Sequence, residues 1–274
     1  MPVKKDASGR RSVQAEAEVP GTPEHVWRAI ASGPGVSSWF VPTTIDERVG
    51  GAVTLNFGPG MDATATITAW DPPRRFEAES RDENGPAIAT EWTVEARSGG
   101  TCVVRVVHSW FASNDDWDKE FESREHGWMA FFRILRLYLT HFSGESSAVL
   151  QAMAFVPGAV PAAWEALTSP LGLLGATAGS QVKSPAGAPA LAGIVERVGP
   201  AESPELLLRL EQPAPGIAHL FALAMGGQVC LPVRVFLYGR DVAAIAEREE
   251  RSWQSFMQAR FPPDSPTAVA QESS

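Results

Sequence analysis

The sequence predicts an α+β fold that is built twice along the chain. The phrase VPGTPEHVWRAIAS at Val19–Ser32 returns as VPGAVPAAWEALTS at Val156–Ser169. Each copy follows a strand-like segment and precedes short strand-like runs and one long helix-like segment. Two more echoes keep the same order: CVVRV with CLPVRV, and EHGW with ERSW. Three echoes in one order indicate a duplicated unit.

The first half opens with a strand, a turn and a short helix. Residues Ser12–Val19 alternate apolar and polar side chains, which is typical of a strand. Pro20-Gly21 predicts a turn, and Thr22 is placed to cap a helix that has Pro23 at its first position. The apolar face of this helix is supplied by Val26, Trp27 and Ile30.

Several short strands and a long helix follow in the first half. The strand-like runs, separated by Gly, Pro and Asn turns, are Gly51–Phe57, Ala63–Trp70, Arg75–Arg81, Ala87–Glu95 and Thr101–Phe111. Runs this short predict an antiparallel meander. A helix is then predicted by an apolar face at steps of four and three residues, formed by Trp128, Phe132, Leu135, Leu139 and Phe142.

The second half repeats this order in a degraded form. Its predicted strands are Ala148–Phe155, Ala192–Val198, Glu205–Glu211 and Val229–Leu237, and a helix is predicted at Asp241–Phe261. We therefore expect one domain at residues 12–145 and a divergent second copy at 146–262. The polar ends, residues 1–11 and 263–274, are expected to be disordered tails.

Composition excludes several classes of protein. The 274 residues carry a net charge of −9, which argues against a nucleic-acid partner or an anionic membrane surface. Cys102 and Cys230 are far apart and lie in apolar runs, so neither a disulfide framework nor a metal site is expected. No secretory signal and no spanning segment is predicted, and we expect a cytoplasmic protein without membrane insertion.

The first half also resembles a known family. The phrases that carry the resemblance are VPGTPEHVWRAI, the Trp39-Phe40 pair, VGGAV, WDPPRRF, EWTVE, GGTCVVRVVHSWF and HGWMAFFRILRLYL. In this order and spacing they resemble the SRPBCC or START-like superfamily, specifically the Hsp90 ATPase activator homologue (AHSA1-like) group. The second half resembles the family only in its opening helix, its GIVERV strand and its final helix.

The resemblance implies a helix-grip fold, also described as START-like or Bet v1-like. In that fold a curved antiparallel sheet wraps on a long C-terminal helix, and here it would be present twice. The space between the sheet and the helix often forms a cavity that holds an apolar ligand. A hydrophobic or amphipathic small molecule is therefore the expected partner.

The residues themselves are compatible with such a cavity. Alternation along Thr101–Phe111 directs His108 and the neighbouring tryptophan toward the long helix, while Arg105 faces outward. The predicted cavity residues are Trp39, Phe40, Trp92, His108, Trp110, Trp128, Phe132 and Leu135. The alternative is that this aromatic stripe is simply core and that His108 is a structural, hydrogen-bonded residue. His108 as an acid–base group or as a metal ligand is the remaining interpretation.

No familiar catalytic motif occurs, so no catalytic residue, metal or cofactor is predicted. The leading hypothesis is a non-enzymatic protein that binds a small hydrophobic molecule. One alternative is a co-chaperone-like interaction module, as the Hsp90-activator resemblance suggests. The other is a cyclase or hydrolase that uses His108 in the helix-grip cavity. The sequence allows a homodimer but does not determine the oligomeric state.

Overall fold

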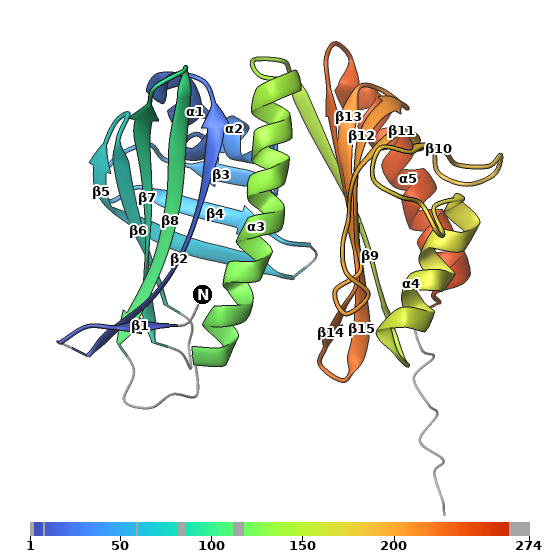
Figure 1. Ribbon diagram of the computed structural model, residues 1–274, viewed down its shortest axis with the longest axis horizontal. Helices are drawn as coiled ribbons and strands as arrows, with labels where there is room; N and C mark the ends of the chain where they lie inside the picture. Colours follow the sequence, from blue (N-terminus) through green and yellow to red (C-terminus); the bar gives the residue numbers. More distant parts are fainter. Residues whose placement is uncertain (1–2, 8, 59, 82–85, 112–117, 263–274) are drawn as a thin grey trace, which may run out of the picture. The chain divides into compact units, whose positions relative to one another are not determined.

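The computed structural model describes residues 3–7, 9–58, 60–81, 86–111 and 118–262, with side chains in helix α3 described from residue 127 onward (Figure 1). The chain divides into two compact units, Met1–Val149 and Leu150–Ser274. Each unit combines an antiparallel sheet with a few helices, including one long helix, so the predicted α+β class with a repeated architecture is confirmed. The predicted tail at 263–274 lies outside the described residues.

The described part of the first unit contains an eight-stranded sheet in the order β1-β2-β8-β7-β6-β5-β4-β3. Every neighbouring pair in it is antiparallel. The strands are β1 (Lys4–Lys5), β2 (Arg10–Pro20), β3 (Thr43–Ile45), β4 (Ala52–Asn56), β5 (Asp62–Asp71), β6 (Arg75–Arg81), β7 (Ala87–Arg97) and β8 (Thr101–Phe111). Strands β4 to β8 are consecutive neighbours, which is the predicted meander.

The start of the chain differs from the sequence-based expectation. Residues 4–5 and 10–11, expected in a disordered tail, lie in strands β1 and β2. The reason is the length of β8, whose ladder pairs with β2 from Pro20 back to Arg10. Strand β1 then folds back on β2 and pairs Lys5 with Arg11.

The predicted helix start after the Val-Pro-Gly phrase is confirmed. Gly21 adopts a positive φ of 126°, which turns the chain out of β2. The Thr22 side chain accepts a hydrogen bond from the backbone N–H of His25 and caps α1 (Pro23–Ala31). The face that α1 buries includes Val26, Trp27 and Ile30. A second, short helix, α2 (Gly33–Ser37), follows directly and is capped by Ser32.

The long helix α3 (Asp118–His141) packs along β2 and lies against the sheet (Figure 1). Its predicted apolar face is buried at Phe132, Leu135, Leu139 and Phe142, while Trp128 is half-buried. Arg136 and Thr140 are exposed on another side of the helix, and Arg133 is half-buried. The sheet and α3 therefore enclose the aromatic residues of the first unit between them.

The second unit repeats this plan with fewer parts. Its first strand β9 (Ser147–Val156) pairs with its last strand β15 (Gln228–Tyr238), as β2 pairs with β8 in the first unit. The remaining strands are β10 (Gln181–Lys183), β11 (Ala192–Val198), β12 (Glu205–Gln212), β13 (Gly216–Phe221) and β14 (Leu223–Met225). The helices are α4 (Val160–Thr168), the 3-10 turn η1 (Ser169–Leu171) and α5 (Val242–Arg260).

Strands β13 and β14 act as one interrupted partner of β15. Leu220 pairs with Val233 and Leu223 pairs with Cys230, so both strands follow one register. The break falls opposite Pro232, which has no N–H to donate to the ladder. At the break the N–H of Ala222 bonds instead to the carbonyl of Pro204.

One buried hydrogen bond in the first unit gives a direct test of the fold. The Trp39 indole N–H donates to the carbonyl of Ala29 at 2.8 Å, in the last turn of α1, where helix carbonyls lack intrahelical partners. Trp39→Phe should lower the free energy of unfolding by about 1–3 kcal/mol, because it leaves this carbonyl unsatisfied and removes buried surface. Urea unfolding measures the change.

Trp70→Phe is the matched control, since Trp70 is half-buried in β5 and makes no indole hydrogen bond in the described structure. If both variants lose equal stability, the hydrogen bond from Trp39 does not have the role assigned to it.

Candidate functional site

Strands β7 and β8 place the predicted site residues on the face that α3 covers. His108 lies directly opposite Thr90, and Trp92 lies opposite Val106, so these four residues share one face of the sheet. The alternation predicted for β8 is confirmed at Cys102, Val104, Val106, His108 and Trp110, all of which are buried.

Trp128 lies at the centre of the aromatic residues that the sheet and α3 bring together. Its ring stacks on Phe40 with centroids 5.1 Å apart and an interplanar angle of 27°. The edge of Trp92 lies against it at 5.1 Å and 86°, and Phe132 is 5.9 Å away. Trp39 joins the cluster through Trp92 at 6.3 Å. We call these five residues and His108 the aromatic site.

Two predicted residues do not join these ring contacts. Trp110 is buried in a different cluster, with Val13 and Ile88. Leu135 is fully buried further along α3 and, as an aliphatic side chain, makes no ring contact. The predicted group is therefore divided: one part surrounds Trp128, and Trp110 contributes to a neighbouring part of the core.

Other aromatic residues that sequence reasoning did not select extend the cluster. Phe131 meets Phe40 at 4.4 Å, and Phe57 meets Phe40 at 5.7 Å. On the other side Phe76 stacks on Trp92 at 6.3 Å and also contacts Trp27. Phe131 departs from the helical spacing used to choose residues, and Phe76 lies two strands away from His108. Only the fold brings them together.

Both ring nitrogens of His108 are engaged. The Trp128 indole N–H donates to Nε2 at 2.7 Å, and Nδ1 lies 2.9 Å from the hydroxyl of Thr90. An indole N–H can only donate, so Nε2 must be the acceptor and carries no proton in this arrangement. The proton of the neutral ring is then on Nδ1, which donates to Thr90. Thr90 is a site residue that the sequence did not single out.

Exposure differs across the aromatic site. Trp39, Phe40, Trp92 and Phe132 are each at most 8% exposed, and His108 is 9% exposed. Trp128 alone among the site's members is half-buried. Solvent therefore reaches this group of side chains chiefly at Trp128.

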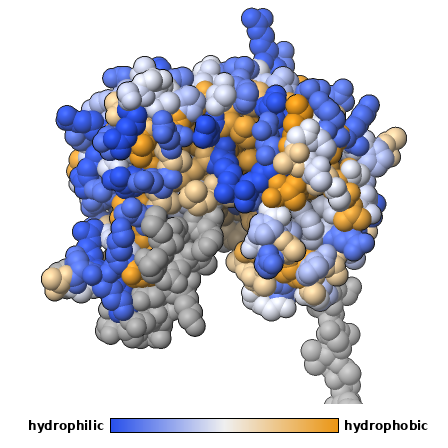
Figure 2. Space-filling view, in the orientation of Figure 1, coloured by the Kyte–Doolittle hydropathy of each residue, from blue (hydrophilic) through white to orange (hydrophobic). Residues whose placement is uncertain are grey.

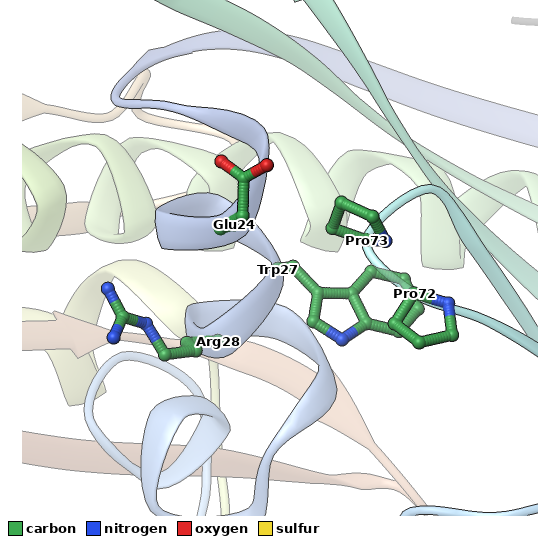
Figure 3. A pocket seen from close by; sticks show the side chains of 5 residues that line it. All are labelled: Glu24, Trp27, Arg28, Pro72 and Pro73. Carbon is green, nitrogen blue, oxygen red and sulfur yellow. The ribbon is translucent and has the colours of Figure 1, made fainter.

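The two most distinct pockets in the described structure are not lined by the aromatic site. One, of about 360 Å³, is bordered by α1 and the turn after β5 and is lined by Glu24, Trp27, Arg28, Pro72 and Pro73. Figure 3 shows the Trp27 indole directed toward the two prolines, with Arg28 pointing away. The other, of about 290 Å³, is lined by Glu18, Val19, Pro20, Thr101, Arg136 and Thr140. This second pocket is bordered by β2, the start of β8 and α3, and no residue of the aromatic site lines it.

Neither cysteine is set up as a nucleophile. Burial is the main cause that raises the pKa of the Cys102 thiol, and it raises the pKa of Cys230 to about 11. Both thiols therefore stay protonated near neutral pH. Among the described residues there is no group of three or more His, Cys, Asp or Glu side chains that could hold a metal ion. Within the same residues, no helix is long and apolar enough to cross a membrane.

The second unit has a different set of buried polar groups. His219 Nε2 donates to Glu205 at 3.1 Å, and Arg197 also bonds this carboxylate. Arg234 is 5% exposed, lies over the Phe221 ring at 5.7 Å, and has its pKa lowered to about 10 by burial. No counterpart of the His108–Trp128 hydrogen bond occurs among these described residues.

One protein-family model matches most of the first unit. Residues 20–140 match the model of the Activator of Hsp90 ATPase homolog 1-like protein family. These residues form an AHSA1-like domain. The match covers α1 and α2, strands β3 to β8 and nearly all of α3, and hence every member of the aromatic site. No curated protein matches the sequence.

Solved structures similar to the chain include both single-domain and two-domain proteins. The di-domain ARO/CYC BexL from the BE-7585A biosynthetic pathway is 13% identical, with 93% of this chain and 100% of that chain covered and a TM-score of 0.44. DynU16, from the dynemicin biosynthetic locus, is 15% identical over 90% and 96% of the two chains, with a TM-score of 0.41. Protein MLL2253 from Mesorhizobium loti is 21% identical over 47% of this chain and 97% of its own, with a TM-score of 0.43.

The hydrogen bonds of His108 predict its tautomer. Long-range ¹H–¹⁵N spectra of the full chain should report a neutral ring with the proton on Nδ1 and none on Nε2. Thr90→Val should lower the free energy of unfolding by about 1 kcal/mol, because it leaves the Nδ1–H without its acceptor. Thr66→Val is the control, because the exposed Thr66 side chain makes no hydrogen bond in the described structure. A proton found on Nε2 would contradict the assigned geometry.

Proposed function

We propose that the AHSA1-like domain binds an apolar, mainly aromatic small molecule between its sheet and α3, at the aromatic site. Binding, rather than catalysis, is the proposed activity. The observation that carries this proposal is the hydrogen bond between His108 and Trp128, the one half-buried member of the aromatic site.

The chemistry of the site supports a ligand of this kind. Ligand sites in proteins are mostly apolar and contain a few polar groups that orient the ligand. Here the walls are aromatic rings, and the orienting group is His108, which Thr90 holds in place. The rings pack against one another, so a ligand that enters among them must displace one of them. Trp128 is the member that can leave most easily, because it is already partly in solvent.

Catalysis by His108 is less well supported than binding. A general base needs a free nitrogen lone pair that points at the substrate. The Nε2 lone pair accepts from Trp128, and Nδ1 carries the proton given to Thr90. Displacement of Trp128, which ligand binding also requires, would free the Nε2 lone pair, but a cyclase or hydrolase role would in addition need a second catalytic group.

The family description favours a second candidate function, a co-chaperone-like interaction with an Hsp90-type ATPase. Such a role needs a docking surface rather than an interior site. On the face in Figure 2 hydrophobic residues form several separate spots among hydrophilic ones. Among the described residues of the first unit, Phe111 is the largest exposed apolar side chain, 63% exposed at the end of β8. A pull-down with such an ATPase, followed by measurement of its turnover, tests this candidate.

Ligand binding by the full chain tests the main proposal. A panel of polycyclic aromatic and polyketide-like compounds should raise the melting temperature and change the tryptophan fluorescence. Phe132→Leu should weaken binding of any hit by about three- to tenfold, because the ligand loses an aromatic contact. Isothermal titration calorimetry measures the affinity.

The control for this test is Trp164→Phe in α4, which changes a half-buried tryptophan of the second unit. It should leave affinity unchanged. If no compound shifts the melting temperature, or if both variants weaken binding equally, the proposed function is wrong.

A further inference from the structure

We infer that the Trp128 indole occupies the place of the ligand, and that the ligand is a flat aromatic molecule with an N–H or O–H donor at its edge. This inference rests on the proposed function and deepens it, since it names the class of ligand. It follows from the acceptor at the end of the site, from the rings around Trp128 and from the exposure of Trp128.

The tautomer of His108 sets the acceptor. In the tautomer that the Trp128 indole N–H requires, the proton lies on Nδ1 and is donated to the Thr90 hydroxyl, so Nε2 presents a lone pair. A ligand that takes the place of the indole without changing this tautomer must therefore donate a hydrogen bond to Nε2. Indole N–H, phenol O–H and amide N–H groups meet this requirement, whereas ethers and carbonyls do not.

The rings around Trp128 define the shape of the ligand. Phe40 stacks on the indole at 27°, while Trp92 presents its edge at 86°. The imidazole of His108 is inclined by only 26° to the indole plane, and the two nitrogens are 2.7 Å apart. The donor therefore lies near the imidazole plane, where the Nε2 lone pair points. A flat ligand with its donor in the ring plane reproduces this arrangement.

The exposure of Trp128 favours its displacement. Trp128 is the half-buried member of the aromatic site, whereas the other members are buried. Its indole can therefore exchange its place with a ligand that offers the same hydrogen bond. The hydrogen bond from the ligand replaces the one from Trp128. The donor therefore contributes to affinity chiefly because a ligand without one would leave Nε2 buried and unsatisfied.

A cavity variant tests this inference in the full chain. Trp128→Ala should open a slot that binds indole, detected by calorimetry and by recovery of the melting temperature. Indole should bind about tenfold more tightly than indene, which has the same shape but no N–H. In Trp128→Ala with His108→Phe, the preference for indole over indene should disappear.

Phe132→Ala is the matched control. It removes an aromatic ring from the same helix face and leaves the Trp128–His108 hydrogen bond in place. Any cavity at this position should bind indole and indene equally. Equal affinities in Trp128→Ala, or no binding of either compound by that variant, would overturn the inference.

A second variant tests the inference in case Trp128→Ala does not fold. Trp128→Phe keeps a ring at the position but has no donor for Nε2, so 2-naphthol should bind it more tightly than it binds the wild-type chain. Weaker binding by Trp128→Phe would also overturn the inference. A different outcome is that Trp128→Ala binds indole more tightly than indene while the wild-type chain binds no aromatic compound with a hydrogen-bond donor. In that case the inference about the acceptor at Nε2 is supported and the proposed function is wrong.

Discussion

The hydrogen bond from the Trp128 indole to Nε2 of His108 joins α3 to the middle of the sheet in the AHSA1-like domain. In the tautomer that it sets, the Nδ1 proton is donated to Thr90, and Phe40 and Trp92 pack against the indole. Without it, a buried imidazole lone pair would be left unsatisfied, which is unfavourable in an apolar surrounding. The neutral state of His108 and the chemistry of a ligand at Nε2 therefore depend on this one contact.

Much of the domain could be predicted from the sequence because its elements carry local signals. The helix start at Thr22 and Pro23 depends only on residues within one helical turn, and alternation along β8 predicts that His108 faces inward. Whether the inward face encloses an empty cavity could not be predicted. That depends on Phe76 and Phe131, whose positions are set by strand order and helix rotation rather than by neighbouring residues.

The two units show that a repeated sequence phrase can have different surroundings in each copy. The CVVRV and CLPVRV echoes place an arginine on the last strand of each unit. Arg105 is partly exposed and pairs with Glu16 at 2.9 Å, whereas Arg234 is buried. The extra residue in the second copy puts Cys230 and Arg234 on one face of β15, while Cys102 and Arg105 lie on opposite faces of β8. The copies thus share topology and differ in the chemistry of their faces.

The most direct measurement is a crystal structure of the full chain with 2-naphthol. The naphthol ring should lie against Phe40 with its hydroxyl donating to Nε2 of His108, and the Trp128 indole should have moved out of this position. A complex in which the Trp128–His108 hydrogen bond is intact, with the naphthol bound instead at the groove beside Trp27 and Pro72, would contradict this account.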